Sequence, residues 1–156
     1  MSFRQTEVEL RAFLQSIEFS EAAAVTLTMK KRSGAKVADD INASKNFRHF
    51  RNRLDNVILG SRAKRYGAKL RMLAVIERSA DYRLHYHCII ERPYYCSIER
   101  FDAAVRDQWL KTEFGYRQVD IQDQPNASWT DYILKQRQKS SLLDSIDWAN
   151  CQLTAE

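Results

Sequence analysis

The stretches "KLRMLAVIER" (residues 69–78) and "RLHYHCIIER" (residues 83–92) decide which fold the sequence predicts. Each is an apolar run of strand length flanked by charged residues, and only a short polar segment separates them. Two such runs joined by a short turn are typical of an antiparallel β-hairpin. Pro93 follows the second run and ends it, because proline cannot donate a ladder hydrogen bond.

The second strand of this hairpin has two different faces, because side chains alternate across a strand. One face is apolar and carries Leu84, Tyr86, Cys88 and Ile90. The other face carries His85 and His87, which are therefore expected on the side of the sheet away from the packed helices. On the partner strand the same alternation places Glu77 nearly opposite His85.

Hydrophobic periodicity predicts further elements on both sides of the hairpin. Apolar residues recur at helical spacing in three segments, 5–17, 44–59 and 97–111. Two segments alternate as strands do, 22–31 and 116–122. The interior order βαββαβ predicts a ferredoxin-like, RRM-like α+β fold, with an antiparallel sheet, helices packed on one face and the histidines on the other.

Local signals predict where some of these elements begin and end. Ser44 is the expected N-cap of the second helix and Gly60 its stop, and the polar residues 31–43 indicate a mobile loop. Ser128 opens a pattern that resembles a capping box and predicts a helix to about residue 139. The tail, residues 140–156, is expected to hold one more short helix.

The chain has 156 residues and is expected to form one domain, 1–156, with its core over about 22–138. No apolar run approaches the roughly 20 residues of a membrane span. Acidic residues interrupt the first apolar residues, unlike a secretory signal. Three cysteines without CxxC spacing favour a reducing compartment. These features predict a cytoplasmic protein with no membrane partner.

The formal net charge is +5, and basic residues gather in the segment 45–71, which holds a single acid, Asp55. The basic residues are Lys45, Arg48, Arg51, Arg53, Arg62, Lys64, Arg65, Lys69 and Arg71. Such a cluster can neutralise the phosphates of a nucleic acid and release their counterions. A solvated basic helix face is the alternative interpretation, and charge alone does not separate the two.

Glu77, His85 and His87 form a candidate metal site on the predicted hairpin. Two imidazoles and a carboxylate within side-chain reach suit divalent ions from magnesium and manganese to zinc. Three protein ligands leave coordination positions for a substrate. The alternative is that two solvated histidines and a surface glutamate share a hairpin.

A candidate nucleophile lies in "SWTDYILKQRQK" (residues 128–139). At helical spacing Tyr132, Lys135 and Gln136 project from one face. Tyrosine is a weak nucleophile at neutral pH because its side-chain pKa is roughly 10, but a metal ion and a nearby cation favour its attack. The alternatives are that Tyr132 only packs against the sheet, or that Tyr94 or Tyr95 is the reactive tyrosine.

Three segments, in order, resemble the motifs of the HUH endonuclease superfamily and most closely its rolling-circle replication initiators. They are "VTLTMK" (Val25–Lys30), "LHYHCII" (Leu84–Ile90) and "YILK" (Tyr132–Lys135). Glu77, eight residues before the first histidine, matches an acidic metal ligand of many viral initiators. The resemblance covers about residues 22–138, and the second and third motifs are the specific ones.

The resemblance implies a metal-dependent endonuclease that nicks single-stranded DNA at a replication origin, in some cases within a hairpin. Mn²⁺ or Mg²⁺ on Glu77, His85 and His87 would polarise a phosphate. Tyr132 would attack it, leaving a covalent 5′-phosphotyrosine and a free 3′-hydroxyl that starts rolling-circle replication. Lys135 would stabilise the phenolate, and the basic segment 45–71 would follow the DNA backbone.

Two departures from the initiator pattern bear on partners and ligands. Gln136 completes a YxxxQ pattern, which single-tyrosine transposases have and in which the glutamine can join the metal site. No Walker A motif occurs, so a helicase and a polymerase would come from the host. The location would be cytoplasmic in a bacterial host and nuclear for a eukaryotic virus.

Three other functions fit parts of the pattern. A transposase or relaxase of the same superfamily shares the chemistry. A non-catalytic RRM-like module that binds RNA or DNA shares the fold, but it expects aromatic residues on the open sheet face. A metal hydrolase in which water attacks would leave Tyr132 as a bystander. Covalent attachment of the protein to DNA separates the nicking enzymes from the binding module and the hydrolase.

Overall fold

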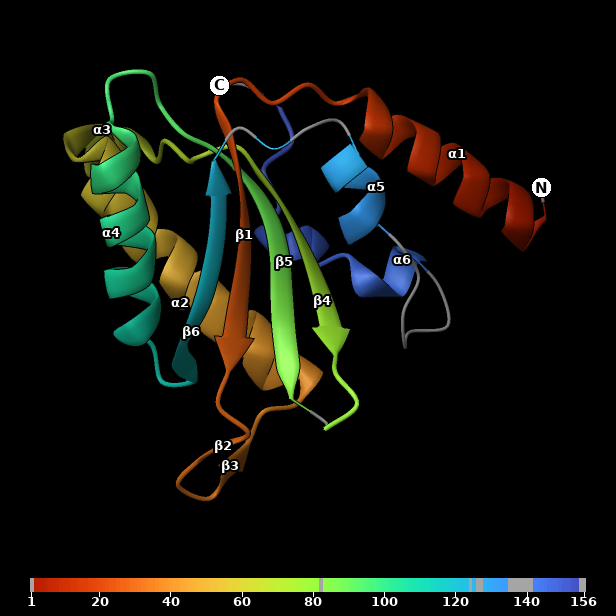
Figure 1. Cartoon of the computed structure of the whole chain (residues 1–156), viewed down its shortest axis with the longest axis horizontal. Helices are drawn as coiled ribbons and strands as arrows, with labels where there is room; N and C mark the ends of the chain where they lie inside the picture. The colour runs from red at the N-terminus through yellow and green to blue at the C-terminus, as the bar shows by residue number, and fades with distance from the viewer. Residues whose placement is uncertain (1, 82, 124, 126–127, 135–141, 155–156) are drawn as a thin grey trace.

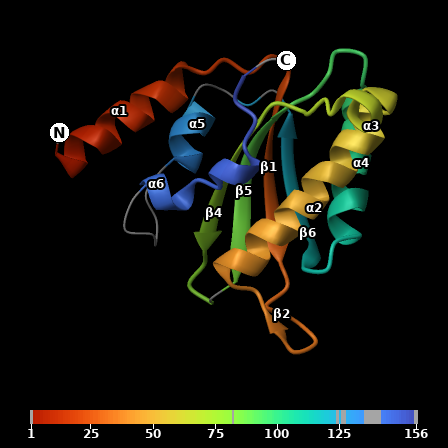
Figure 2. The same cartoon turned by 180° about the vertical axis from the view of Figure 1, so that it is seen from behind.

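The computed structural model describes residues 2–81, 83–123, 125, 128–134 and 142–154. Its centre is a four-stranded antiparallel sheet in the order β4-β5-β1-β6 (Figure 1). The strands are β1 (Ala22–Met29), β4 (Met72–Arg78), β5 (Leu84–Glu91) and β6 (Gly115–Asp123). Two long helices, α2 (Asp40–Leu59) and α4 (Ile98–Leu110), cover one face (Figure 2). This arrangement confirms the predicted ferredoxin-like α+β fold.

The main core lies between the sheet and these two helices. It contains the face of β5 that alternation marked as apolar, Leu84, Tyr86, Cys88 and Ile90. The ring of Phe47 on α2 stacks on that of Tyr86, with 4.3 Å between centroids. Trp109 on α4 is fully buried and donates its indole N–H to the carbonyl of Thr28 at 2.9 Å. The histidines therefore lie on the other face of the sheet, as expected.

That other face is also partly covered, which the sequence did not indicate. The helices α1 (Phe3–Ser16), α5 (Ser128–Ile133) and α6 (Leu142–Ser145) lie on it (Figure 1). A second core joins them to β4 and β5 through Leu14, Leu73, Val75, Ile89, Ile133, Leu134, Leu142 and Ile146. The cover is needed because these two strands carry apolar side chains on both faces. Over β6 the same face is exposed at Gln118, Asp120 and Gln122.

The start of α2 differs from the prediction. Asp39 is the N-cap, and its side chain accepts the backbone N–H of Asn42 at 2.7 Å. Ser44 therefore lies inside the first turns of the helix, so its prediction as the cap was wrong, whereas Gly60 does end the helix. The expected loop before α2 contains a small hairpin of β2 (Arg32–Ser33) and β3 (Lys36–Val37). A short helix, α3 (Ser61–Tyr66), follows α2.

The C-terminal tail is built into the fold at the edge of β4. After α6 comes a 3₁₀ turn, η1 (Trp148–Asn150), and the backbones of Met72 and Gln152 exchange hydrogen bonds of 2.8 and 2.9 Å. The Tyr86 hydroxyl donates to Asp147 at 2.7 Å. The tail thereby supplies the edge strand with partners that it would otherwise lack. None of the described helices combines the length and apolarity needed to cross a membrane.

Candidate active site

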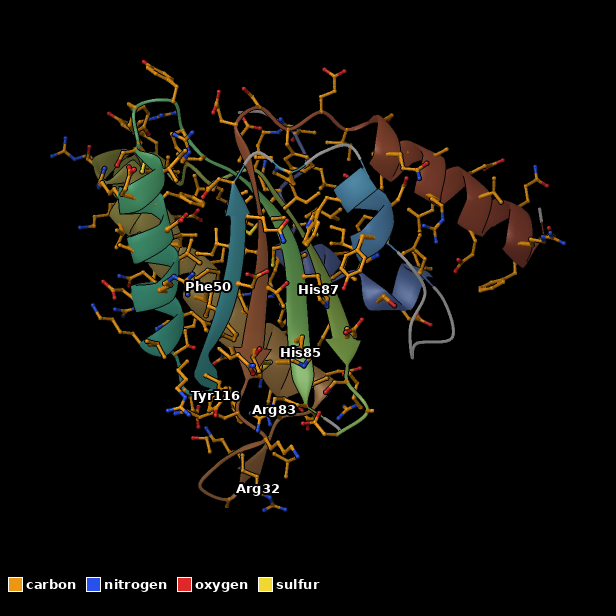
Figure 3. The ribbon with its side chains drawn as sticks, in the orientation of Figure 1. Arg32, Phe50, Arg83, His85, His87 and Tyr116 are labelled. Atoms are coloured by element: carbon orange, nitrogen blue, oxygen red, sulfur yellow. The ribbon has the colours of Figure 1, made fainter. Side chains whose placement is uncertain are left out.

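The β4–β5 hairpin and strand β1 bring the predicted metal ligands to one face of the sheet. Glu77 pairs with His85 across the hairpin, which confirms the expected register. On the other side of β5, Thr26 pairs with His87 and Thr28 with His85. The Glu77 side chain reaches diagonally, and its Oε1 lies 3.3 Å from Nε2 of His87. In Figure 3 both histidines lie on the viewer's side of β5.

Two threonines of β1 hold the histidine rings. The hydroxyl of Thr26 lies 3.3 Å from Nδ1 of His87, and that of Thr28 lies 3.2 Å from Nδ1 of His85. With Nδ1 engaged in this way, Nε2 is the nitrogen that a metal ion would take in each ring. Neither threonine was assigned a role from the sequence, although the alternation of Val25–Lys30 places them together on one face.

Burial keeps His85 in the form that binds metal ions. Desolvation lowers the pKa of His85, and the nearby carboxylate of Glu77 opposes this effect. His87 is only 6% exposed. A neutral imidazole is the metal-binding form of histidine, because the proton must leave before the nitrogen can coordinate. The site therefore favours coordination near neutral pH.

Tyr132 lies beside the histidines because α5 is anchored on the sheet. Ile133 and Leu134 are buried in the second core, so the other side of the helix turns outward. The Tyr132 ring is 46% exposed and its centroid lies 6.2 Å from that of His87. The Trp129 ring lies 5.1 Å from the Tyr132 ring. Of the tyrosines considered, Tyr132 is thus the one next to the histidines.

The rival tyrosines lie elsewhere. Tyr94 and Tyr95 follow the end of β5 away from His85 and contact each other, with 5.4 Å between ring centroids. They line a different hollow, together with Arg62 and Lys69.

The donors fit a divalent cation chemically, but they are not drawn together around one. Within the described ranges, no three His, Cys, Asp or Glu side chains are gathered as a metal site. The ring centroids of His85 and His87 are 6.5 Å apart, so His85 would have to turn toward the Glu77–His87 pair. Two imidazoles and a carboxylate remain a suitable set for Mn²⁺ or Mg²⁺. Lys135 and Gln136 lie outside the described residues, so their predicted roles stay predictions.

The basic segment 45–71 is not next to the histidines. It consists mainly of α2 and α3, and α2 covers the opposite face of the sheet (Figure 2). Exposed members of the cluster are Lys45, Arg48, Arg62, Lys64, Arg65 and Lys69. Arg71 is partly buried and pairs with Glu91 at 2.7 Å. The basic side chain near the histidines is instead Arg83, whose guanidinium lies 4.7 Å above the Tyr116 ring (Figure 3).

Arg51 is a structural residue, so its prediction as a DNA contact was wrong. It is 3% exposed and donates to the carbonyls of Leu70 and Asn150. Its Nε lies 3.6 Å from the carboxylate of Asp55, which in turn accepts the N–H of Leu70 at 3.0 Å. The pair ties α2 to the start of β4 and to the tail.

We expect Arg51→Ala to lower the free energy of unfolding by about 3–5 kcal/mol, because it leaves a buried carboxylate without its cation. Urea unfolding followed by circular dichroism measures this loss. Lys45→Ala on the same helix is the control and should change stability by less than about 0.5 kcal/mol, because Lys45 is exposed. Equal losses in the two variants would contradict a structural role for Arg51.

A protein-family model for replication-associated proteins of the ORF2 type matches residues 22–141 of the chain. The matched segment starts at the first residue of β1 and includes both histidines, Glu77 and Tyr132. Helix α1 lies before it. No curated protein and no solved structure matches the chain.

Proposed function

Because this chain belongs to the ORF2-type family of replication-associated proteins, we propose that it initiates rolling-circle DNA replication by nicking and rejoining single-stranded DNA through Tyr132. One observation carries this proposal: the half-exposed ring of Tyr132 lies 6.2 Å from His87, whose Nε2 contacts Glu77. A phenol beside metal-binding side chains is the arrangement that phosphoryl transfer to tyrosine needs.

In the proposed reaction the Tyr132 hydroxyl oxygen attacks a phosphorus atom of the DNA backbone. The bond from phosphorus to the 3′-oxygen breaks, the tyrosine loses its proton, and the 3′-oxygen gains one. The products are a 5′-phosphotyrosine and a 3′-hydroxyl. The number of phosphate ester bonds is unchanged, so the reverse reaction rejoins ends without ATP.

The other residues of the site have distinct proposed roles. Glu77, His85 and His87 would hold Mn²⁺ or Mg²⁺, which supplies positive charge to the phosphate when bound. Thr26 and Thr28 fix the orientation of the two rings. Lys135 would stabilise the phenolate, and Gln136 would act as a further ligand. A transposase or relaxase would use the same chemistry on a different DNA.

A covalent adduct is the test of this proposal. The full chain is incubated with a labelled pool of single-stranded oligonucleotides and MnCl₂, and the products are run on a denaturing gel. We expect a slower band that disappears when EDTA replaces the metal ion. Cleavage without the band would mean that water attacks, and binding without cleavage would indicate a binding module.

We expect Thr26→Val to lower the rate of adduct formation about 10- to 100-fold at limiting Mn²⁺, because His87 loses the group that orients its ring. Valine keeps the shape of threonine, so the fold should persist. Rates are measured against Mn²⁺ concentration, and excess Mn²⁺ should restore much of the loss. Thr6→Val, on exposed helix α1, is the control. A loss that excess Mn²⁺ does not reduce would contradict an orienting role.

A further inference from the structure

A cavity of about 630 Å³ lies on the histidine face of the sheet, between the segment that follows α1 and helix α5. Residues that line it include Gln15, Phe19, Ala22, Ile89, Trp129 and Asp131. Its volume is in the range of sites that hold small organic groups, about 300–1,000 Å³. We propose that this cavity binds one nucleobase of the DNA strand, close to the phosphate that Tyr132 attacks. The inference rests on the proposed function and names how the nick site is selected.

The cavity and the nucleophile share a wall. Trp129 lines the cavity, and its ring lies 5.1 Å from that of Tyr132. Ile89 lines it from β5, two residues beyond His87 and on the same face of the sheet. A strand whose phosphate reaches Tyr132 and His87 therefore has this cavity beside it, where a neighbouring base can enter.

The lining suits a nucleobase because it combines apolar surfaces with a few polar groups. Ala22, Ile89 and Phe19 offer apolar contact, and Trp129 offers an aromatic ring of the kind on which bases stack. The buried indole N–H of Trp129 has no hydrogen-bond partner in the part of the chain that the structure describes. Buried donors normally have a partner, and an acceptor atom of a base would supply one.

The polar rim also indicates which bases are preferred. Asp131 lines the cavity, and its carboxylate accepts a hydrogen bond from the side-chain amide of Gln15. A carboxylate only accepts hydrogen bonds, so it favours a base with an exocyclic amino group. Adenine, cytosine and guanine carry both this donor and an acceptor for the indole N–H, whereas thymine has no amino group.

One wall of the cavity comes from residues outside the family match. Gln15 and Phe19 precede residue 22, where the match begins. This wall is fixed in place: Leu14 is fully buried, Arg11 donates to the carbonyl of Leu134 at 2.9 Å, and the guanidinium of Arg71 lies 5.1 Å from the Phe19 ring. The chain thus adds its own element to the matched segment, next to the nucleophile.

The test first locates the nick by sequencing DNA that is covalently attached to the full chain. Oligonucleotides with one abasic position each, stepping through the nucleotides on both sides of the nick, are then compared for the rate of adduct formation. We expect one abasic position to slow the wild-type protein about 10-fold or more, because the stacked base is lost. Replacing that base by thymine should also slow it.

Two variants and a control make the test specific to the cavity. Ala22→Phe fills the cavity, so abasic DNA at that position should react no more slowly than intact DNA. Gln15→Ala removes the partner of Asp131, so the discrimination against thymine should weaken. Gln5→Ala makes the same substitution on α1 away from the cavity, and it should keep the wild-type profile.

The outcomes separate this inference from the proposed function. An adduct whose abasic profile is the same in wild type, Ala22→Phe and Gln15→Ala overturns the base-binding role and leaves the nicking reaction intact. Should Ala22→Phe fail to fold, Gln15→Ala alone decides. Absence of any adduct with the wild-type protein on every oligonucleotide overturns the nicking reaction, and the cavity's role with it.

Discussion

Tyr132→Phe is expected to lower the rate of covalent adduct formation by at least about 10³-fold, because the substitution removes only the attacking oxygen. The ring itself stays, with its contacts to His87 and Trp129. The ring is also half exposed, so stability should change by less than about 0.5 kcal/mol. Binding of single-stranded DNA should persist. The measurements are a time course on denaturing gels, thermal unfolding, and fluorescence anisotropy with labelled DNA.

The same substitution elsewhere provides the matched control. Tyr95→Phe removes a hydroxyl from one of the rival tyrosines, which lies beyond the far end of β5 and lines a separate hollow. Its adduct rate should equal that of the wild type. A Tyr132→Phe protein that still forms the adduct would move the nucleophile to another residue. Peptide mapping of the DNA-linked tyrosine would then identify it.

His87→Ala is expected to slow adduct formation by about 10²-fold or more and to weaken binding of Mn²⁺, even though Tyr132 remains. His87 is the residue that links the parts of the site. Its Nε2 contacts Glu77, its Nδ1 lies near the hydroxyl of Thr26, and its ring lies next to Tyr132. Loss of a ligand should cost at least as much as loss of the group that orients it, about 10- to 100-fold. Isothermal titration calorimetry with MnCl₂ and the gel assay measure the two effects.

His49→Ala is the control for this variant, since His49 is exposed on α2. His87 is nearly buried, so His87→Gln, which keeps a polar group of similar size, checks that any loss is not simply unfolding. Circular dichroism should show a folded protein in all three. If His87→Ala formed the adduct at the wild-type rate when Mn²⁺ is limiting, the histidine would have no role in holding the ion.

The faces of the sheet could be predicted because they depend on local alternation alone. The period of two in β5 separates the histidines from Leu84 and Tyr86, and the short turn sets Glu77 opposite His85. The contact of Tyr132 with His87 depends instead on how α5 docks, which periodicity does not determine. Ile133 and Leu134 decide that docking by burying their side chains against β4 and β5.

Charge counting failed at Arg51 because it ignores which side of a helix a residue occupies. The buried positions of α2 include Phe47, Arg51, Leu54 and Ile58, at spacings of three and four. Arg51 therefore lies within the apolar stripe, where Asp55 four residues later offers it a partner. That spacing was the available signal. Ser44 failed as a cap for another reason: Asp39 competed for the role, and Ser44 binds Asp147 of the distant tail instead.

The position of β1 in the sheet has a consequence for how the protein is made. This strand occupies an interior position, yet it is the first to leave the ribosome: Val25 pairs with Cys88 on one side and with Ile121 on the other. Both partners are translated much later, so the apolar residues of β1 wait without neighbours while most of the chain is synthesised. Sheets that depend on such distant pairing fold slowly and expose sticky intermediates. We therefore expect the nascent chain to engage chaperones, and its soluble yield to rise when synthesis is slowed by lower temperature.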